Sequence, residues 1–400
     1  MSLNFQEIHQ KIKEIGAGLQ EREKERAQHR ARARALFAEH AQNVDGLRAR
    51  VEMLKAIDPN LRCALPVREP LDTHLPPPPL PSQATLIAAD GSQINPDRHA
   101  SVLFGVINVG AIVYHLNSGL TTRIETESAL LFEEALSYNG RILSDGLVAL
   151  RRDLDERRKL EAMAAEFGQD GAPVITFTDG PIELWGGRED DEAEAFYEAL
   201  QKYKAVLSRL QQRGVINAGY VDKPGAELVV RLLELATYDP SQDGDLRAYR
   251  PLRGVGDRWL FGEKGNPLLG SGERSAVFAI QSTSEKQYQG VLAVHFFYIN
   301  VGTLNHPYPV RVEIPKWVAD DAEKLGWLHA VLVDQCRQMG ARPYPYLLHR
   351  AHEIALVSNE EKFQVEQMLQ MEIRRHGGET DEKSYKQTAK DAPGRTGYRS

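Results

Sequence analysis

The chain has 400 residues, of which 42% are hydrophobic and 26% charged, and its formal net charge is −7 at pH 7. This composition is typical of a globular enzyme and excludes a collagen-like or largely disordered chain, and no apolar run approaches the roughly 18 residues of a membrane span. The small negative charge gives no global sign of nucleic-acid binding, although it is compatible with a local basic channel. The two cysteines, Cys63 and Cys336, form no CxxC pair and no signal-peptide core opens the chain, so we expect a reduced, cytoplasmic protein.

Residues 1–57 are predicted to form one or two long helices, because apolar residues recur at helical spacing on either side of a charged segment. The two apolar stripes are Ile8, Ile12, Ile15 and Leu19, and Leu36, Val44, Leu47, Val51 and Leu54. The pattern favours a solvated or coiled-coil arm at residues 1–64, for self-association first and for docking to a partner second. A nucleic-acid-binding arm is the alternative, because residues 27–35 carry only positive charge.

The proline-rich segment at residues 65–83 is predicted to be an extended linker, because proline fixes φ and has no amide donor. A compact domain is expected at residues 84–375, and the polar tail at residues 376–400 is expected to be disordered, although its Lys and Arg side chains could touch a partner.

Within the compact domain, apolar strands and helices alternate. Strands are predicted at 84–89, one or two within 100–116, and at 172–179, 214–222, 274–283, 290–300 and 308–315; helices are predicted at 125–167, 190–213, 226–236, 318–339 and 345–375. A hairpin-rich start followed by strand–helix–strand units predicts an α/β fold with a mixed central sheet flanked by helices.

Two of the apolar strands are predicted to end in an aspartate that a glycine follows, Asp90-Gly91 and Asp179-Gly180. Carboxylates at the carboxyl ends of central strands lie at the edge of a sheet where ligands bind. Two neighbouring carboxylates repel each other unless a cation lies between them, and oxygen ligands suit Mg²⁺ or Mn²⁺ rather than zinc. An Asp-Gly pair is also typical of a turn, and this alternative stays open.

Further candidate ligands lie on two predicted helices. Glu161 stands in an apolar neighbourhood, whereas Glu156 and Asp153 belong to a charged run that favours a solvated face. His349 and His352 share one helical face, and no third histidine or cysteine lies nearby to support a zinc site. His352 is expected to face inward, with a hydrogen-bonded structural histidine as the alternative.

With these residues assembled, the chain resembles the NurA nuclease family. The resemblance lies in "AADGSQ" at 88–93, the helix that carries Glu161, "FTDGPIELW" at 177–185, "YVDKP" at 220–224, "GERSAVF" at 272–278 and "PYPYLLHRAHEIALV" at 343–357. The segments span residues 84–357, and the resemblance implies an RNase H-like fold.

The resemblance also implies an activity and its partners. The implied activity is that of a Mn²⁺-dependent deoxyribonuclease, with Mg²⁺ as a weaker substitute. Such an enzyme would act as a 5′→3′ exonuclease and single-strand endonuclease in double-strand-break end resection. The resemblance implies that the protein forms a homodimer and works with a HerA-type hexameric ATPase. This chain has no GxxxxGK[ST] segment, so an ATP-driven step would come from the partner.

Site residues follow from the resemblance position by position. It implies that Asp90, Glu161, Asp179 and His352 are the catalytic metal ligands and that Tyr344, or alternatively Tyr346, contacts a phosphate or a base. Lys223 and Arg274 are expected to contact DNA phosphates, with surface ion pairs as the alternative. Trp185, Phe296, Phe297 and Tyr298 would stack on unpaired bases or belong to the core.

Two rival functions use the same residues. A nucleotide phosphohydrolase needs the same carboxylates but no strand-sized channel. A non-catalytic DNA-binding or adaptor subunit needs no intact site, and the presence of both aspartates, the glutamate and the histidine argues against it.

Overall fold

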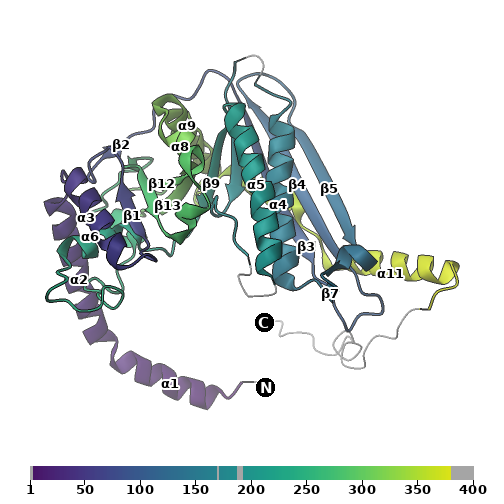
Figure 1. Cartoon of the computed structure of the whole chain (residues 1–400), viewed down its shortest axis with the longest axis horizontal. Helices are drawn as coiled ribbons and strands as arrows, with labels where there is room; N and C mark the ends of the chain where they lie inside the picture. Colours follow the sequence, from purple (N-terminus) through teal and green to yellow (C-terminus); the bar gives the residue numbers. More distant parts are fainter. Residues whose placement is uncertain (1–2, 169–170, 187–191, 380–400) are drawn as a thin grey trace. The chain divides into compact units, whose positions relative to one another are not determined.

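The computed structural model describes residues 3–168, 171–186 and 192–379 (Figure 1). The described residues form two compact units. Unit 1 comprises the described residues within 3–80, 180–182 and 218–345, and unit 2 comprises those within 81–179, 183–217 and 346–379. None of the helices in the described part of the chain is long and apolar enough to span a bilayer. Of the predicted polar tail, residues 380–400 lie outside the described residues.

Unit 2 is built on a mixed sheet. Its strands are β3 (Ala84–Ile94), β4 (Gly105–Leu116), β5 (Arg123–Leu131), β8 (Val174–Asp179) and the first residues of β9 (Ile216–Val221), in the order β9-β8-β3-β4-β5. Strands β3, β4 and β5 form an antiparallel meander, and β8 runs parallel to β3. The start of β9 is tied to β8 by the Thr176 hydroxyl, which donates to Asn217 Oδ1 at 2.9 Å.

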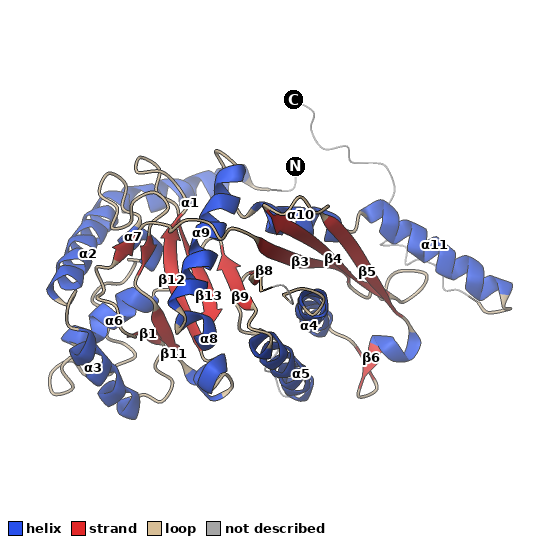
Figure 2. Ribbon diagram, turned by 90° about the horizontal axis from the view of Figure 1, so that it is seen from above, coloured by secondary structure: helices blue, strands red, loops and turns tan. Residues whose placement is uncertain are grey.

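Helices cover both faces of this sheet. Figure 2 shows α4 (Asp145–Ala164) and α5 (Ala193–Gln212) on one face and α10 (Tyr346–Ala355) on the other. The short hairpin β6 (Ser137–Tyr138) and β7 (Arg141–Ile142), which follows the 3-10 turn η1 (Glu133–Leu136), leads into α4, and α11 (Asn359–Arg375) follows α10. Three antiparallel strands, a helix, a parallel strand, a helix and a further strand confirm the expected α/β fold with a mixed central sheet flanked by helices.

The predicted helix at 125–167 is only half correct. Its first part forms β5 and the β6–β7 hairpin, and the helix begins at Asp145, where the Ser144 hydroxyl accepts from the Leu147 amide at 3.1 Å. The sequence "ETESALL" is rich in helix-forming residues, but pairing with β4 along the whole of β5 outweighs that weak preference.

The first Asp-Gly pair does not end its strand. Strand β3 continues through Asp90 and Gly91 to Ile94, and each of these residues is paired with β4. Only the parallel pairing with β8 stops at Ala89. The turn alternative is therefore wrong for Asp90-Gly91, whereas β8 does end at Asp179, and Gly180 has a φ of 89°.

The carboxyl-terminal helical region consists of two helices rather than one. Helix α10 ends at Ala355, and Ser358 caps α11 through a capping box with Glu361. Helix α11 presents Val365 and Leu369 to a small cluster of Ile94, Phe104 and Val106.

Unit 1 holds the remaining strands. In the order of the sheet they are β1 (Cys63–Pro66), β11 (Phe278–Gln281), β12 (Val294–Asn300), β13 (Pro309–Pro315) and the rest of β9, and each is antiparallel to its neighbour. The short strand β10 (Arg274–Ser275) pairs with β12 and with β2 (His74–Leu75). Every residue of β12 and β13 is buried. Phe296, Phe297 and Tyr298 are therefore core residues, as the alternative stated.

The helices of unit 1 include the amino-terminal region. They are α1 (Phe5–Ala17), α2 (Leu19–Glu39), α3 (Val44–Ile57), α6 (Leu228–Thr237), α7 (Asp257–Phe261), α8 (Lys316–Ala319) and α9 (Ala322–Gln338), with 3-10 turns η2 (Thr283–Lys286) and η3 (Gly290–Leu292). Leu47, Val51 and Leu54 of the second predicted stripe are buried, whereas the first stripe is exposed. Residues 63–66, at the predicted junction of arm and linker, form a strand paired with β11. The described residues up to Leu80 belong to the same compact unit as residues 218–345.

Helix α10 approaches β4 so closely that only glycine fits beneath it. A Cβ atom on Gly110 would lie 2.5 Å from the Ala355 nitrogen and 2.8 Å from the Ile354 carbonyl carbon. Both atoms belong to the backbone and cannot move aside without displacing the helix.

We therefore expect Gly110→Ala to lower the free energy of unfolding by about 1–3 kcal/mol, the usual cost of overpacking. Gly146→Ala in α4 is the matched control, since its Cβ would meet only side-chain oxygens at 3.4 Å or more and alanine favours the helix. Urea unfolding of both variants measures the effect, and equal stabilities would contradict the close approach of α10.

Candidate functional site

The site begins with a hydrogen bond between β3 and α10. His352 Nδ1 donates to Asp90 Oδ2 at 2.7 Å, and Asp90 Oδ1 accepts from the Gly91 amide at 2.9 Å. The Asp90 side chain is 17% exposed and that of His352 is 60% exposed. With Nδ1 bound to the carboxylate, the imidazole presents Nε2 as its remaining ligand atom.

The carboxyl end of α10 is fixed to the sheet one turn after His352. The Ala355 carbonyl accepts from the Ser92 hydroxyl and, at 2.8 Å, from Asn108 Nδ2. The Ser128 hydroxyl donates to Asn108 Oδ1 at 2.7 Å and so orients the amide. These bonds satisfy a helix-terminal carbonyl that has no partner within the helix, and they hold His352 over Asp90.

Asp179 lies level with Asp90 on the neighbouring strand. The parallel register pairs Ala89 with Thr178, and its next step sets Asp90 beside Asp179. Neighbouring strands are about 4.8 Å apart, so the two carboxylates share one edge of the sheet. Asp179 is exposed at the end of β8.

Glu156 of α4 reaches β3 from the opposite face, at Gly91. A Cβ atom on Gly91 would lie 2.7 Å from Glu156 Oε1 and 2.6 Å from Arg152 Cγ. The absence of a side chain at Gly91 therefore lets Glu156 approach the strand next to Asp90. Glu156 is 5% exposed.

Arginines balance these carboxylates. Arg152 Nε lies 3.3 Å from Glu156 Oε1, and Arg152 Nη2 lies 2.7 Å from Asp153 Oδ1. Arg157 Nη1 donates to Glu156 Oε2 at 2.8 Å. Burial nevertheless raises the pKa of Glu156 to about 8; the charges of Asp153 and Asp90 add to this rise, and both arginines oppose it.

Glu161, the glutamate that the resemblance selected, faces α5. Its Oε2 lies 3.1 Å from Arg209 Nε and its Oε1 lies 2.6 Å from Arg213 Nη1. The structure thus brings Glu156, and not Glu161, to Asp90.

The other predicted site residues lie apart from this cluster or in unit 1. Arg274 is 7% exposed, and its Nη1 and Nη2 donate to Glu69 at 2.9 and 2.7 Å, so its guanidinium is not available to a phosphate. Lys223 is exposed and has no ion-pair partner among the residues that the structure describes. Tyr344 is half-buried, with its ring edge-on to Tyr220. Tyr346, at the start of α10, is 37% exposed.

The donor types at Asp90 suit a hard divalent cation, since carboxylate oxygens and one imidazole nitrogen are the ligands of Mg²⁺ and Mn²⁺ sites. Within the described ranges, no three His, Cys, Asp or Glu side chains converge as a ready metal site. Arg152, in contact with Asp153 and Glu156 and near Asp90, supplies the positive charge in this structure.

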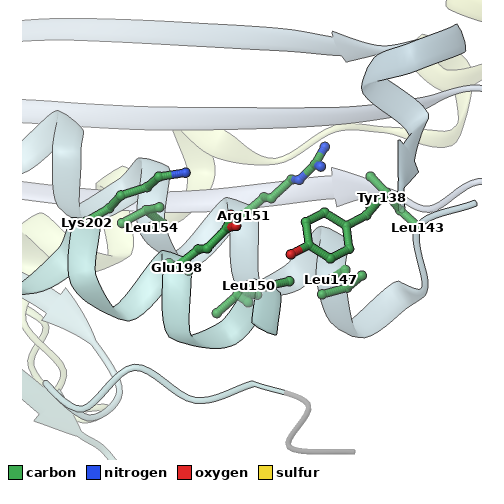
Figure 3. A pocket seen from close by; sticks show the side chains of 10 residues that line it. Tyr138, Leu143, Leu147, Leu150, Arg151, Leu154, Glu198 and Lys202 are labelled. Atoms are coloured by element: carbon green, nitrogen blue, oxygen red, sulfur yellow. The ribbon is translucent and has the colours of Figure 1, made fainter. Parts of the chain in front are cut away.

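An apolar cavity of about 100 Å³ lies elsewhere in unit 2, among α4, α5 and the β6–β7 hairpin (Figure 3). Its lining includes Leu147, Leu150 and Leu154, with Tyr138 and Arg151 at its edge. The residues that line this cavity do not include Asp90, Glu156, Asp179 or His352. The cavity is therefore separate from the candidate site.

Sequence reasoning missed Glu156, although a signal was present. Glu156 stands four and seven residues before Leu160 and Met163, which are buried, so it continues the apolar stripe of α4. The charged neighbours Asp155, Arg157 and Arg158 hid this position in the sequence.

The raised pKa of Glu156 predicts how stability depends on pH. Because the folded protein holds this proton more tightly than the unfolded chain does, its contribution to stability is complete below about pH 4.5 and is lost as the pH rises to about 8. The slope is at most about 1.4 kcal/mol per pH unit for one proton.

Urea unfolding in the presence of a chelator checks this across that pH range. We expect Glu156→Gln to remove the slope, because glutamine does not titrate, and Glu161→Gln to keep it. A slope that both variants share would place the titrating group elsewhere.

The chain was compared with families of known proteins and with solved structures. A family model that describes the NurA domain matches residues 84–357, which confirms the resemblance in the sequence. A comparison with curated proteins gives no match.

Three solved structures are similar to the chain at low identity. The NurA nuclease of Sulfolobus solfataricus is 14% identical, covers 73% of this chain and 85% of its own, and has a TM-score of 0.40. The catalytic domain of human Endonuclease V is 12% identical, with coverage of 72% and 84% and a TM-score of 0.30. Endonuclease V of Ciona intestinalis is 9% identical, with coverage of 83% and 97% and a TM-score of 0.34.

These structural likenesses are too distant to carry an argument about the site. The family match alone decides membership, because it covers more than half of the 400 residues. The chain belongs to the NurA domain family.

Proposed function

We propose that this chain is a divalent-metal-dependent DNA nuclease whose site is formed by Asp90, Glu156, Asp179 and His352. Family membership supports a nuclease. The observation that carries the site is at Gly91, where the absence of a Cβ lets Glu156 approach the strand that holds Asp90 and its partner His352.

Glu156 takes the place that the sequence assigned to Glu161. Each glutamate is paired with two arginines, Glu161 with Arg209 and Arg213 and Glu156 with Arg152 and Arg157. Glu156 differs in being near enough to Asp90 for the two charges to interact. This proximity supports Glu156, rather than Glu161, as the helical ligand of the proposed site.

The residues divide the chemistry between them. Asp90 and Asp179 hold their carboxylates rigidly because both are carried by neighbouring strands. His352 adds one nitrogen ligand, which Mn²⁺ accepts, so we propose Mn²⁺ as the preferred ion and Mg²⁺ as a weaker substitute. A divalent cation held by these residues would supply an acidified water molecule and positive charge opposite the phosphodiester. Lys223, exposed and without an ion pair in the described part of the chain, is proposed to contact the DNA backbone.

The biological setting is also a proposal. We infer a homodimer that acts in DNA end resection with a HerA-type hexameric ATPase, as a 5′→3′ exonuclease and single-strand endonuclease in the cytoplasm. The absence of a GxxxxGK[ST] segment from the sequence agrees with a separate motor. Tyr344, or Tyr346 at the start of α10, is proposed to contact a phosphate or a base.

The direct test is the degradation of an end-labelled single-stranded oligonucleotide with Mn²⁺, Mg²⁺, Zn²⁺ or EDTA. We expect cutting with Mn²⁺, weaker cutting with Mg²⁺ and none with EDTA or with the Asp90→Asn variant. Cleavage of nucleotides but not of DNA would favour the phosphohydrolase. A folded protein that binds DNA and cuts nothing, even with the ATPase, would favour the adaptor subunit.

A matched pair of variants on α4 tests the choice of glutamate. Glu156→Gln is expected to lower the rate of cleavage by about a hundredfold or more, since losing about 3 kcal/mol of transition-state stabilisation has that effect. Glu161→Gln, on the same helix, is expected to keep the wild-type rate within about threefold, because a partly exposed ion pair contributes little.

The rate of cleavage at saturating Mn²⁺ is the measurement for both variants, with folding checked by circular dichroism. The reverse result, an active Glu156→Gln and an inactive Glu161→Gln, would overturn the assignment.

A further inference from the structure

The three residues after Asp179 are held tightly within unit 1. The Gly180 amide donates to the Tyr220 carbonyl at 2.8 Å. A Cβ atom on Gly219 would lie 2.6 Å from the Gly180 oxygen and 2.9 Å from the Ile182 nitrogen. The segment Gly180–Ile182 therefore lies directly against β9, at a point where only glycine leaves room for it.

A buried glutamate completes this attachment. The Ile182 amide donates to Glu313 Oε2 at 3.0 Å, and Glu313 lies opposite Gly219 in the pairing of β13 with β9. Glu313 is 1% exposed. A buried carboxylate that accepts from an amide makes a stronger bond than a neutral acceptor does.

Arg311 pairs with Glu313. Its Nη2 lies 2.8 Å from Glu313 Oε1, and Arg311 is 7% exposed. Its Nε and Nη1 have no hydrogen-bond partner among the described residues, so Glu313 is its closest counter-charge. The pair is thus buried, and one of its oxygens is committed to the segment that follows Asp179.

We propose that Glu313 is a positioning residue that sets the direction of Asp179 toward the bound metal ion. This inference rests on the proposed function. Asp179 is the last residue of β8, it is exposed, and the Gly180–Ile182 segment follows it directly in the chain. A carboxylate at such a strand end keeps one orientation only if the residues after it are also fixed, and Glu313 fixes them through the Ile182 amide.

Glu234 provides a matched control in the same unit. It is 3% exposed, accepts from the Leu252 amide at 3.0 Å and pairs with Arg231 at 2.9 Å. Glu234 therefore makes the same two kinds of contact as Glu313, but to a different loop. A purely structural role predicts the same consequences for both residues.

The experiment measures Mn²⁺ binding to the full chain by titration calorimetry, with thermal unfolding as the check on stability. We expect Glu313→Gln to raise the Kd for Mn²⁺ by about tenfold, the lower end of the effect of outer-shell partners. Glu234→Gln is expected to leave that Kd unchanged while lowering Tm to a similar extent.

A double-mutant cycle shows whether Glu313 acts through Asp179. In an Asp179→Asn background, Glu313→Gln is expected to change the Kd by less than about twofold, because the group it positions is no longer a carboxylate. An effect of Glu313→Gln equal to that of Glu234→Gln, or one that persists in full in the Asp179→Asn background, would overturn the proposal.

Two outcomes of this experiment, a variant that does not fold and an inactive wild type, need separate controls. If Glu313→Gln does not fold, Arg311→Met combined with Glu313→Gln removes both charges and leaves no unpaired arginine, and the same Kd comparison applies. Failure of the proposed function is distinguishable, because the wild type would then neither bind Mn²⁺ nor cut DNA. That result overturns both proposals, whereas an active wild type with an unaffected Glu313→Gln overturns only this one.

Discussion

The hydrogen bond between Asp90 and His352 sets the main constraint on unit 2. It requires α10 to lie against β3 and β4 at a fixed height, and Gly110 allows this because a Cβ there would meet the backbone of Ala355. The Ala355 carbonyl, bound by Ser92 and Asn108, then fixes the end of the helix. The contact between Asp90 and His352 therefore depends on how the whole of α10 packs. Both residues belong to regular secondary structure, a strand and a helix, rather than to loops.

The second constraint is electrostatic. Asp90, Asp153 and Glu156 gather around Arg152, and Glu156 is so well buried that burial raises its pKa to about 8. Arg152 and Arg157 offset this negative charge in the structure, and a divalent cation would bind the carboxylates in place of Arg152. Gly91 is the steric condition for this arrangement, since any side chain there would displace Glu156.

The sequence predicted β3, β4, β8, β9, β12, β13 and most helices, because apolar runs and glycines carry local signals. It failed where tertiary contacts decide. The residues of β5 favour a helix but pair with β4, and Asp90-Gly91 has the composition of a turn but lies inside β3. Glu156 and Glu161 differ in which face of α4 they occupy. Arg274 is buried in an ion pair with Glu69, which lies 205 residues away in the sequence. No local pattern specifies such pairings.

The central proposal is that Asp90 and Glu156 bind one divalent cation at the edge of β3 that β8 leaves unpaired after Ala89. Anomalous scattering from crystals of the full chain soaked in Mn²⁺ tests it most directly. The account predicts a peak about 2–2.3 Å from oxygens of both carboxylates, in the range usual for such ions, with Arg152 turned away from Glu156. A peak bound by Glu161, or protein in which Asp90 remains bound only to His352 at saturating Mn²⁺, would contradict it.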